Sequence, residues 1–208
     1  MKKSLFFLVM AAAILSLGAC ASGPTVSRID VATGERVPDP TNISGRWNDT
    51  AVRSVCESLL NQALEDKAVD RFIKQFTTNN KGDLPSVIVG TFKNDSSEVI
   101  DTTIIATNMR SAIKRSGKLE FVASSDSREE LRAERMDQQV NANENTVAAL
   151  GNETGARLMM TGTVKSIVER SGKIQTRSYF VHAYLTDIET NKIIWDGECN
   201  DLKYFIER

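Results

Sequence analysis

The sequence has few of the residues from which most catalytic and metal sites are built. It contains a single histidine, His182, and three cysteines in 208 residues. The chain therefore has few side chains that could form a zinc site or a Cys–His nucleophilic pair. A lone histidine inside a strand is usually a packing or surface residue. No Gly-x-Ser-x-Gly elbow or Ser-x-x-Lys motif occurs in a strand-turn-helix setting, and there is no glycine-rich phosphate loop. We expect no metal, no cofactor and no enzymatic activity.

The chain also lacks an excess of positive charge. It has 26 basic and 27 acidic residues, and no run of lysines and arginines. Nucleic-acid binding leaves a basic patch or stripe, and so does electrostatic binding to anionic lipid. We therefore expect no nucleic-acid partner, and any attachment to a membrane has to come from something other than surface charge.

A short apolar stretch at the N-terminus has the organisation of an export signal. Lys2 and Lys3 precede an apolar run from Leu5 to Leu17, and the small residues Gly18 and Ala19 follow it. The run is shorter than the roughly 20 residues that a membrane-spanning helix needs. Cys20 comes next, as in a bacterial lipobox, where the cysteine is lipidated and the chain is cut before it. We predict a signal peptide over 1–19 and a lipid on Cys20; an ordinary secretory signal followed by an accidental cysteine is the alternative.

The two remaining cysteines leave a choice open. Cys56 falls on the apolar side of a predicted helix, and Cys199 lies near the end of a predicted strand. A disulfide between them is one option in an oxidising compartment, although sequence gives no geometry for it. We favour a buried free thiol at Cys56.

Residues 20–44 have the composition of a flexible linker, and 45–208 that of one globular domain. The linker holds three of the four prolines and few apolar residues. A coil of this length would hold the domain away from the membrane.

The pattern of the domain predicts a single α/β fold. Apolar residues at helical spacing follow the N-cap candidate Asp49, and a shorter helical segment covers 69–76. The apolar run 86–92, the helix 101–116 with Gly117 after it, and the strand 119–123 form a β–helix–β unit, which favours a parallel pairing. Residues 146–153 predict a short helix. Strands over 158–168, 174–186 and 192–202 are separated by hairpin turns, so we expect a mixed sheet with a C-terminal antiparallel meander and helices packed on it.

Residues 126–139 are rich in charges of both signs and poor in apolar residues. One interpretation is a solvated helix with ion pairs three and four residues apart. The other is a recognition surface for a partner protein, because the segment has little core-facing content to justify its length. On this second interpretation the candidate partner-binding residues are Arg132, Glu134 and Arg135.

Several stretches in order along the domain resemble the LpoB family, the outer-membrane lipoprotein activators of penicillin-binding proteins. The most specific are Ser44-Gly45-Arg46-Trp47-Asn48-Asp49-Thr50 and Arg132-Ala133-Glu134-Arg135 with Asp137-Gln138-Gln139; stretches at 87–102, 116–124, 155–162 and 189–198 look similar. The resemblance implies a fold like the N-terminal domain of TolB. It also implies a non-enzymatic, monomeric lipoprotein on the periplasmic side of the outer membrane, which binds a bifunctional penicillin-binding protein and activates peptidoglycan synthesis.

Ala21 after the lipidated position is compatible with sorting to the outer membrane, because an aspartate there is the usual retention signal. The linker is shorter than those of better-known members, so the geometry of partner binding can differ. Two other functions remain alternatives. One is a curli-type secretion-assembly lipoprotein, which should contain alternating lipid-facing strands, and none is evident. The other is a cell-wall hydrolase that uses carboxylates such as Asp95, Glu98 and Asp101, although solvation and helix capping explain these acids better.

Overall fold

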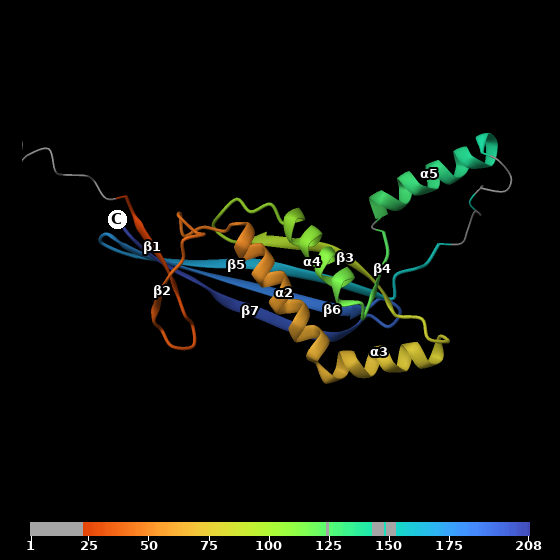
Figure 1. The fold of residues 1–208 in the computed structure, drawn as a ribbon, viewed down its shortest axis with the longest axis horizontal. Coiled ribbons are helices and arrows are strands. Elements are labelled where there is room, and N and C mark those ends of the chain that lie inside the picture. Colours follow the sequence, from red (N-terminus) through yellow and green to blue (C-terminus); the bar gives the residue numbers. More distant parts are fainter. Residues whose placement is uncertain (1–22, 124, 143–147, 149–152) are drawn as a thin grey trace, which may run out of the picture.

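The computed structural model describes residues 23–123, 125–142, 148 and 153–208. They form one mixed α/β domain around a seven-stranded sheet in the order β2-β1-β7-β6-β5-β3-β4 (Figure 1). The predicted signal peptide, Cys20 and most of the predicted short helix at 146–153 lie outside the described residues. Within the described residues, no helix is both long and apolar enough to cross a membrane.

The sheet has a parallel part and an antiparallel part, as predicted. Strand β3 (Ser86–Asp95) lies between β4 (Glu120–Phe121) and β5 (Leu158–Ser171) and is parallel to both. From β5 the chain continues as an antiparallel meander through β6 (Ile174–Asp187) and β7 (Lys192–Glu207). The two turns of the meander fall where the sequence predicts them, at Ser171–Gly172 and Glu189–Asn191.

Four described helices accompany the sheet: α2 (Asp49–Glu65), α3 (Lys67–Asn79), α4 (Thr103–Ser116) and α5 (Ser125–Asn141). Their local signals explain most of their bounds. Helix α4 ends at Gly117, whose φ of 63° is the left-handed conformation that glycine adopts without strain. The cap of α2 is Asn48 rather than the predicted Asp49, because the Asn48 side chain accepts the hydrogen bond from the Ala51 amide.

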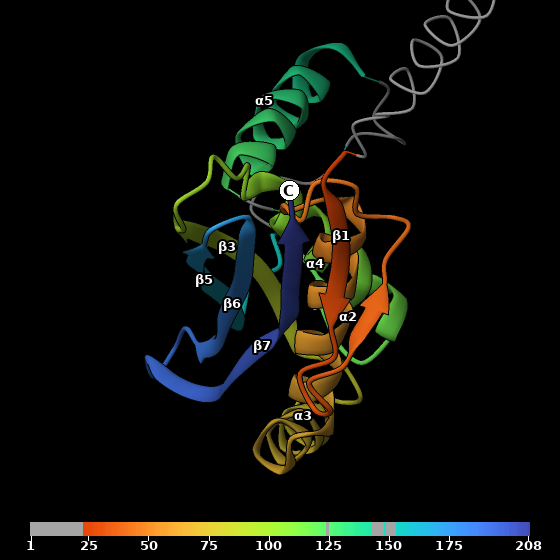
Figure 2. The ribbon, with the colours of Figure 1, turned by 90° about the vertical axis from the view of Figure 1, so that its left-hand side faces the viewer.

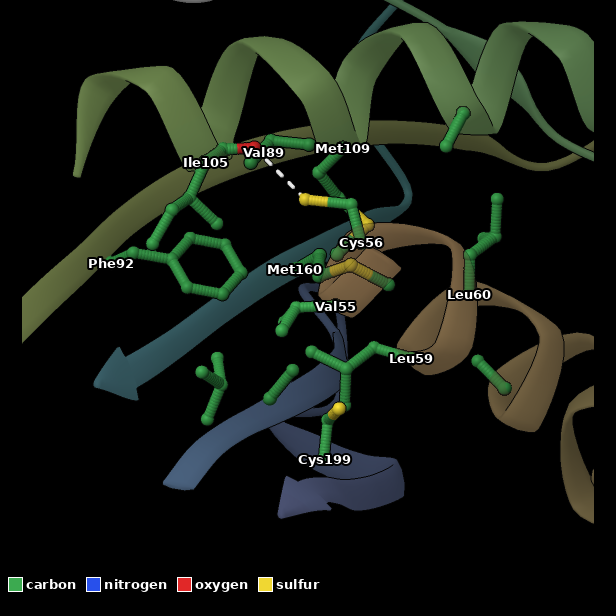
Figure 3. Close-up of a cluster of buried hydrophobic side chains, with 14 of the residues drawn as sticks. Val55, Cys56, Leu59, Leu60, Val89, Phe92, Ile105, Met109, Met160 and Cys199 are labelled. Carbon is green, nitrogen blue, oxygen red and sulfur yellow. Dashed lines mark hydrogen bonds between the residues drawn. The ribbon is translucent and has the colours of Figure 1, made fainter. Parts of the chain in front are cut away.

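The core lies between the sheet and the helices α2 and α4. Val55, Cys56 and Leu59 of α2 meet Ile105 and Met109 of α4 over the strands (Figure 3). Burial of each large aliphatic side chain contributes roughly 1.5–3 kcal/mol. The opposite face of the sheet is half-exposed along β6, at alternate residues from Thr176 to Thr186.

Residues 23–44 correct the prediction of a flexible linker. Strand β1 (Thr25–Ile29) pairs antiparallel with β7, and β2 (Arg36–Pro38) pairs antiparallel with β1. The turn between them is built locally, since the Asp30 carboxylate accepts hydrogen bonds from the amides of Ala32 and Thr33, each at 2.9 Å. The proline-rich composition gave no sign of β1, because this strand depends on pairing with β7, which lies at the other end of the sequence.

Candidate interaction surfaces

Helix α5 stands away from the rest of the domain. It follows β4 at one end of the sheet and makes no extensive contact with any other described helix or strand. Figures 1 and 2 show it projecting beyond the layer formed by the sheet, α2 and α4. A helix placed in this way contributes little to the core, which favours a role in contacts with another molecule.

The polar side of α5 is tied to the chain that returns from it. The Glu153 carboxylate accepts two hydrogen bonds from the Arg132 guanidinium, both of 2.8 Å, and a third of 3.1 Å from Arg135. The hydrogen bond from Arg132 is the main reason why the pKa of Glu153 lies below its usual value. Gln139 donates a hydrogen bond to the Ala148 carbonyl, and Gln138 accepts one from the Ala148 amide.

The structure therefore gives the predicted partner-binding residues specific neighbours. Arg132 and Arg135 come together at Glu153, a partner 21 and 18 residues further along the chain. Glu134 accepts a hydrogen bond of 3.0 Å from Gln138 on the next turn. These side chains are part of the structure that holds α5 in place, and a guanidinium that is already paired has less capacity for a partner's carboxylate.

Helix α5 also exposes two apolar residues that the sequence pattern did not single out as a pair. Met136 is 66% exposed and Val140 is 82% exposed. They are four residues apart, so they lie on the same side of the helix, one and two turns beyond Arg132 and away from Glu134 and Gln138. An apolar i, i+4 pair in an otherwise polar segment is the signal that could have identified them.

A second feature lies at the other end of the sheet, where α2 and α4 begin. A cavity of about 900 Å³ opens there, lined among others by Arg46, Trp47, Ile100, Val168 and Arg177. Loop 96–101 forms one wall and the end of the β5–β6 hairpin another.

A buried network of polar side chains closes the base of this cavity. The Arg177 guanidinium pairs with the Glu98 carboxylate at 2.9 Å and donates to the Gly45 carbonyl at 3.0 Å. The Tyr179 hydroxyl donates to the other Glu98 oxygen at 2.7 Å, and burial, reinforced by this bond, raises the pKa of Tyr179 well above its usual range. The network joins three segments of the chain, so its evident role is structural.

The described histidine and the two described cysteines are each packed against other side chains. His182 pairs with Asp196 at 3.5 Å and packs against the Tyr184 ring on the open face of the sheet. Cys56 and Cys199 are free and buried, and burial raises the pKa of both thiols, that of Cys56 to about 12. Within the ranges described, no group of three or more His, Cys, Asp and Glu residues could hold a metal ion.

One protein family matches most of the chain. The model of the family described as "Peptidoglycan-synthase activator LpoB" matches residues 53–200. No curated protein matches the chain.

Three solved structures illustrate the likeness of fold. The LpoB C-terminal domain from Salmonella enterica is 14% identical, with a TM-score of 0.40, and the alignment covers 72% of this chain and 96% of that domain. The domain from Escherichia coli is 12% identical, with a TM-score of 0.42 and the same shares covered. Lipoprotein GNA1162 from Neisseria meningitidis is 14% identical, with a TM-score of 0.34, over 56% of this chain and 81% of that one.

Proposed function

Because the chain belongs to the LpoB family of peptidoglycan-synthase activators, we propose that it binds a bifunctional penicillin-binding protein and raises its activity without catalysing a reaction itself. The observation that carries this proposal is the match of the family over residues 53–200, which include most of the helix-covered core. The partner makes glycan strands and cross-links them, and the present protein acts on it as a regulator.

The export signal adds a location to this proposal. Cys20 carries the lipid, and the alanine that follows it sends the protein to the outer membrane, where the domain faces the periplasm. A diacylglyceryl group with an additional acyl chain gives stable attachment, whereas a single chain gives only marginal binding. The protein works as a monomer and needs neither metal nor cofactor.

Within the domain, α5 is the surface that we propose for the synthase. It is the described helix with the least contact to the body, and it presents Met136 and Val140 beside the exposed charged residues Glu129 and Arg132. Apolar anchors surrounded by polar residues are the usual arrangement of a protein–protein interface. Arg132 and Arg135 contribute by fixing the orientation of the helix through Glu153.

The proposal is tested with a soluble form, residues 21–208, added to the bifunctional synthase of the same organism. We expect a faster rate of glycan polymerisation and recovery of the synthase in a pull-down. A zymogram of the same sample on peptidoglycan should show no cleared band. A cleared band, or failure to bind any bifunctional synthase, would contradict the proposal.

Substitutions on α5 locate the surface. Met136→Asp with Val140→Asp should weaken synthase binding at least tenfold, as expected when apolar anchors are lost. The matched control is Ile193→Asp, which replaces an exposed apolar residue at the β6–β7 turn and should leave binding unchanged. If the α5 double variant bound the synthase as tightly as the Ile193→Asp control, α5 would not be the binding surface.

A charge exchange separates direct contact from orientation. Arg132→Glu alone breaks the pairing with Glu153 and should weaken binding. Because Glu153 also pairs with Arg135, the compensating variant exchanges all three charges: Arg132→Glu and Arg135→Glu with Glu153→Arg restore ion pairs of reversed direction. If the two arginines act by orienting the helix, this triple variant recovers binding; if they contact the synthase, it stays weak.

A further inference from the structure

The strand register places three parts of the chain at one end of the sheet. Thr25 at the start of β1 pairs with Glu207 at the end of β7, and Glu207 pairs with Ile174 beside the β5–β6 turn. This region, made of residues 25, 170–174 and 207–208, is called the hairpin end. It lies at the left of Figure 1 and faces the viewer in Figure 2.

The hairpin end is also the end closest to the proposed lipid. Only five Cα–Cα steps separate Cys20 from Thr25, which pairs with β7. Such a segment spans about 18 Å at most, even when it is fully extended. A domain beginning at residue 45 would have been free to move far from the membrane, but the pairing of β1 with β7 removes that freedom.

The opposite end of the sheet is much further away than this tether can reach. Strand β6 has 14 residues and runs from the hairpin end to the turn at Glu189–Asn191, a length of about 45 Å. Helix α5 leaves from that opposite end, because β4, which precedes it, pairs with β3 at Ser86 and Val87. Figure 1 shows α5 and α3 at the end away from β1.

The charges distinguish an upright domain from one that lies flat. The hairpin end exposes three basic residues, Arg170, Lys173 and Arg208. Within the residues that define it, the acidic side chain is that of Glu207. Basic side chains of this length reach phosphate groups while their stems contact apolar surface. The open face of the sheet carries charges of both signs. The exposed acids Asp196 and Glu198 lie at its middle and repel anionic head groups, and its bases Lys165 and Lys203 lie closer to the hairpin end.

We propose that the domain stands on a phospholipid surface on its hairpin end, with α5 directed away from the membrane. The proposal rests on the lipid anchor of the proposed function and deepens it. In this orientation α5 lies about one sheet length from the membrane, because the segment between Cys20 and β1 is too short to act as a long tether. The synthase therefore has to approach the outer membrane to reach α5.

The orientation is measured with the mature lipidated full chain in vesicles of phosphatidylethanolamine with a minority of phosphatidylglycerol. Two variants, Ser171→Cys and Lys192→Cys, each carry a fluorescent donor at an exposed position, at opposite ends of β6, and neither removes a basic residue of the hairpin end. The buried thiols of Cys56 and Cys199 do not compete for the label. With acceptor lipids in the vesicles, energy transfer from position 171 should be several-fold stronger than from position 192.

Other results overturn the proposal in distinguishable ways. Equal transfer from both positions means that the domain lies flat or moves freely, and stronger transfer from 192 means that it is inverted. A chain that does not float with the vesicles has no anchor, which overturns this proposal together with the lipid part of the proposed function. Stimulation of the synthase by the same labelled variants in detergent reports separately on activation, so failure of one measurement does not imply failure of the other.

Discussion

Gly162 shows how a single residue sets the packing of the sheet against the core. A Cβ atom at this position would lie 2.4 Å from the His182 carbonyl oxygen and 2.4 Å from the Phe92 ring. The Phe92 ring, 2% exposed, thus occupies the space that a side chain would take. The strand backbone on one side and a buried ring on the other leave little room for adjustment.

We therefore expect Gly162→Ala to lower the free energy of unfolding by about 3 kcal/mol, through overpacking. Gly155→Ala is the control, because no heavy atom lies within 4 Å of the Cβ position there, and it should change stability by less than about 1 kcal/mol. Urea unfolding of both variants measures the difference. Similar unfolding free energies would mean that Phe92 moves without cost.

The buried thiols give a second prediction at the scale of single residues. Burial, with a smaller effect of the Glu57 charge, raises the pKa of Cys56 from 9.0 to about 12. Because the thiolate is the reactive form, neither Cys56 nor Cys199 should react with a disulfide reagent at about pH 8 in the folded soluble form, and both should react in denaturant. Fast reaction of either thiol in the native protein would contradict the burial described.

The same shift predicts the direction of an effect of pH on stability. A pKa that is raised in the folded state stabilises the protein fully below the unfolded value, near 9, and this contribution is lost as the pH rises toward 12. The stability of the wild type should accordingly fall more steeply above pH 9 than that of Cys56→Ala. Parallel curves for the two proteins would rule out Cys56 as the cause.

At the scale of elements, the two ion pairs that join α5 to the returning chain share a single carboxylate, that of Glu153. Glu153→Gln removes the charge that holds Arg132 and Arg135, so local opening of residues 125–142 should become several-fold more frequent while the midpoint of global unfolding stays unchanged. Hydrogen exchange measures the local opening, and a thermal unfolding curve measures the midpoint. Glu130→Gln is the control, since it makes the same change at an exposed position of the same helix.

Acid should produce the same local opening. The pKa of Glu153 is lowered in the folded state, so its contribution is complete above the unfolded value, near 4.5, and is lost as the pH falls through the folded value. Exchange in α5 that is insensitive to both the substitution and acid would show that other contacts hold the helix.

The elements that the sequence predicts well are those with local signals. The apolar spacing of α2, the glycine that ends α4 and the turns of the meander need no knowledge of distant residues. The mixed sheet is confirmed for the same reason, because each strand carries its own apolar pattern. The anchoring of α5 was not predictable, since Glu153 lies 21 residues from Arg132 and nothing in its neighbourhood marks it as a partner.

Strand β1 is the clearest case in which local composition misleads. The segment has too few apolar residues, among them Val26 and Ile29, to predict a strand, because prolines, glycines and polar residues surround them. The segment is ordered because β7 offers a free edge, and Val26 packs partly against the core. The contact joins residues 25–29 to 203–207, a separation over which sequence patterns carry no information about pairing.

At the scale of the whole molecule, β1 and β2 decide where the folded domain begins. Without them the long strand β7 would become an edge, and its Tyr204 and Ile206 would lose the cover of β1 and of the turn at Gly45. An exposed apolar edge strand is a template for pairing with other chains. A protein cut at the boundary that composition suggests, residue 45, should therefore be both less stable and prone to self-association.

This is tested by comparing soluble forms that begin at residue 23 and at residue 45. Loss of β1 and β2 should remove about 3 kcal/mol of stability, which corresponds to a fall of about 10 °C in Tm for a chain of this size. Size-exclusion chromatography should show dimers or larger species for the shorter form only. If the two forms melted at the same temperature and both remained monomeric, residues 23–44 would act as a tether after all, and the short distance between lipid and domain would no longer follow.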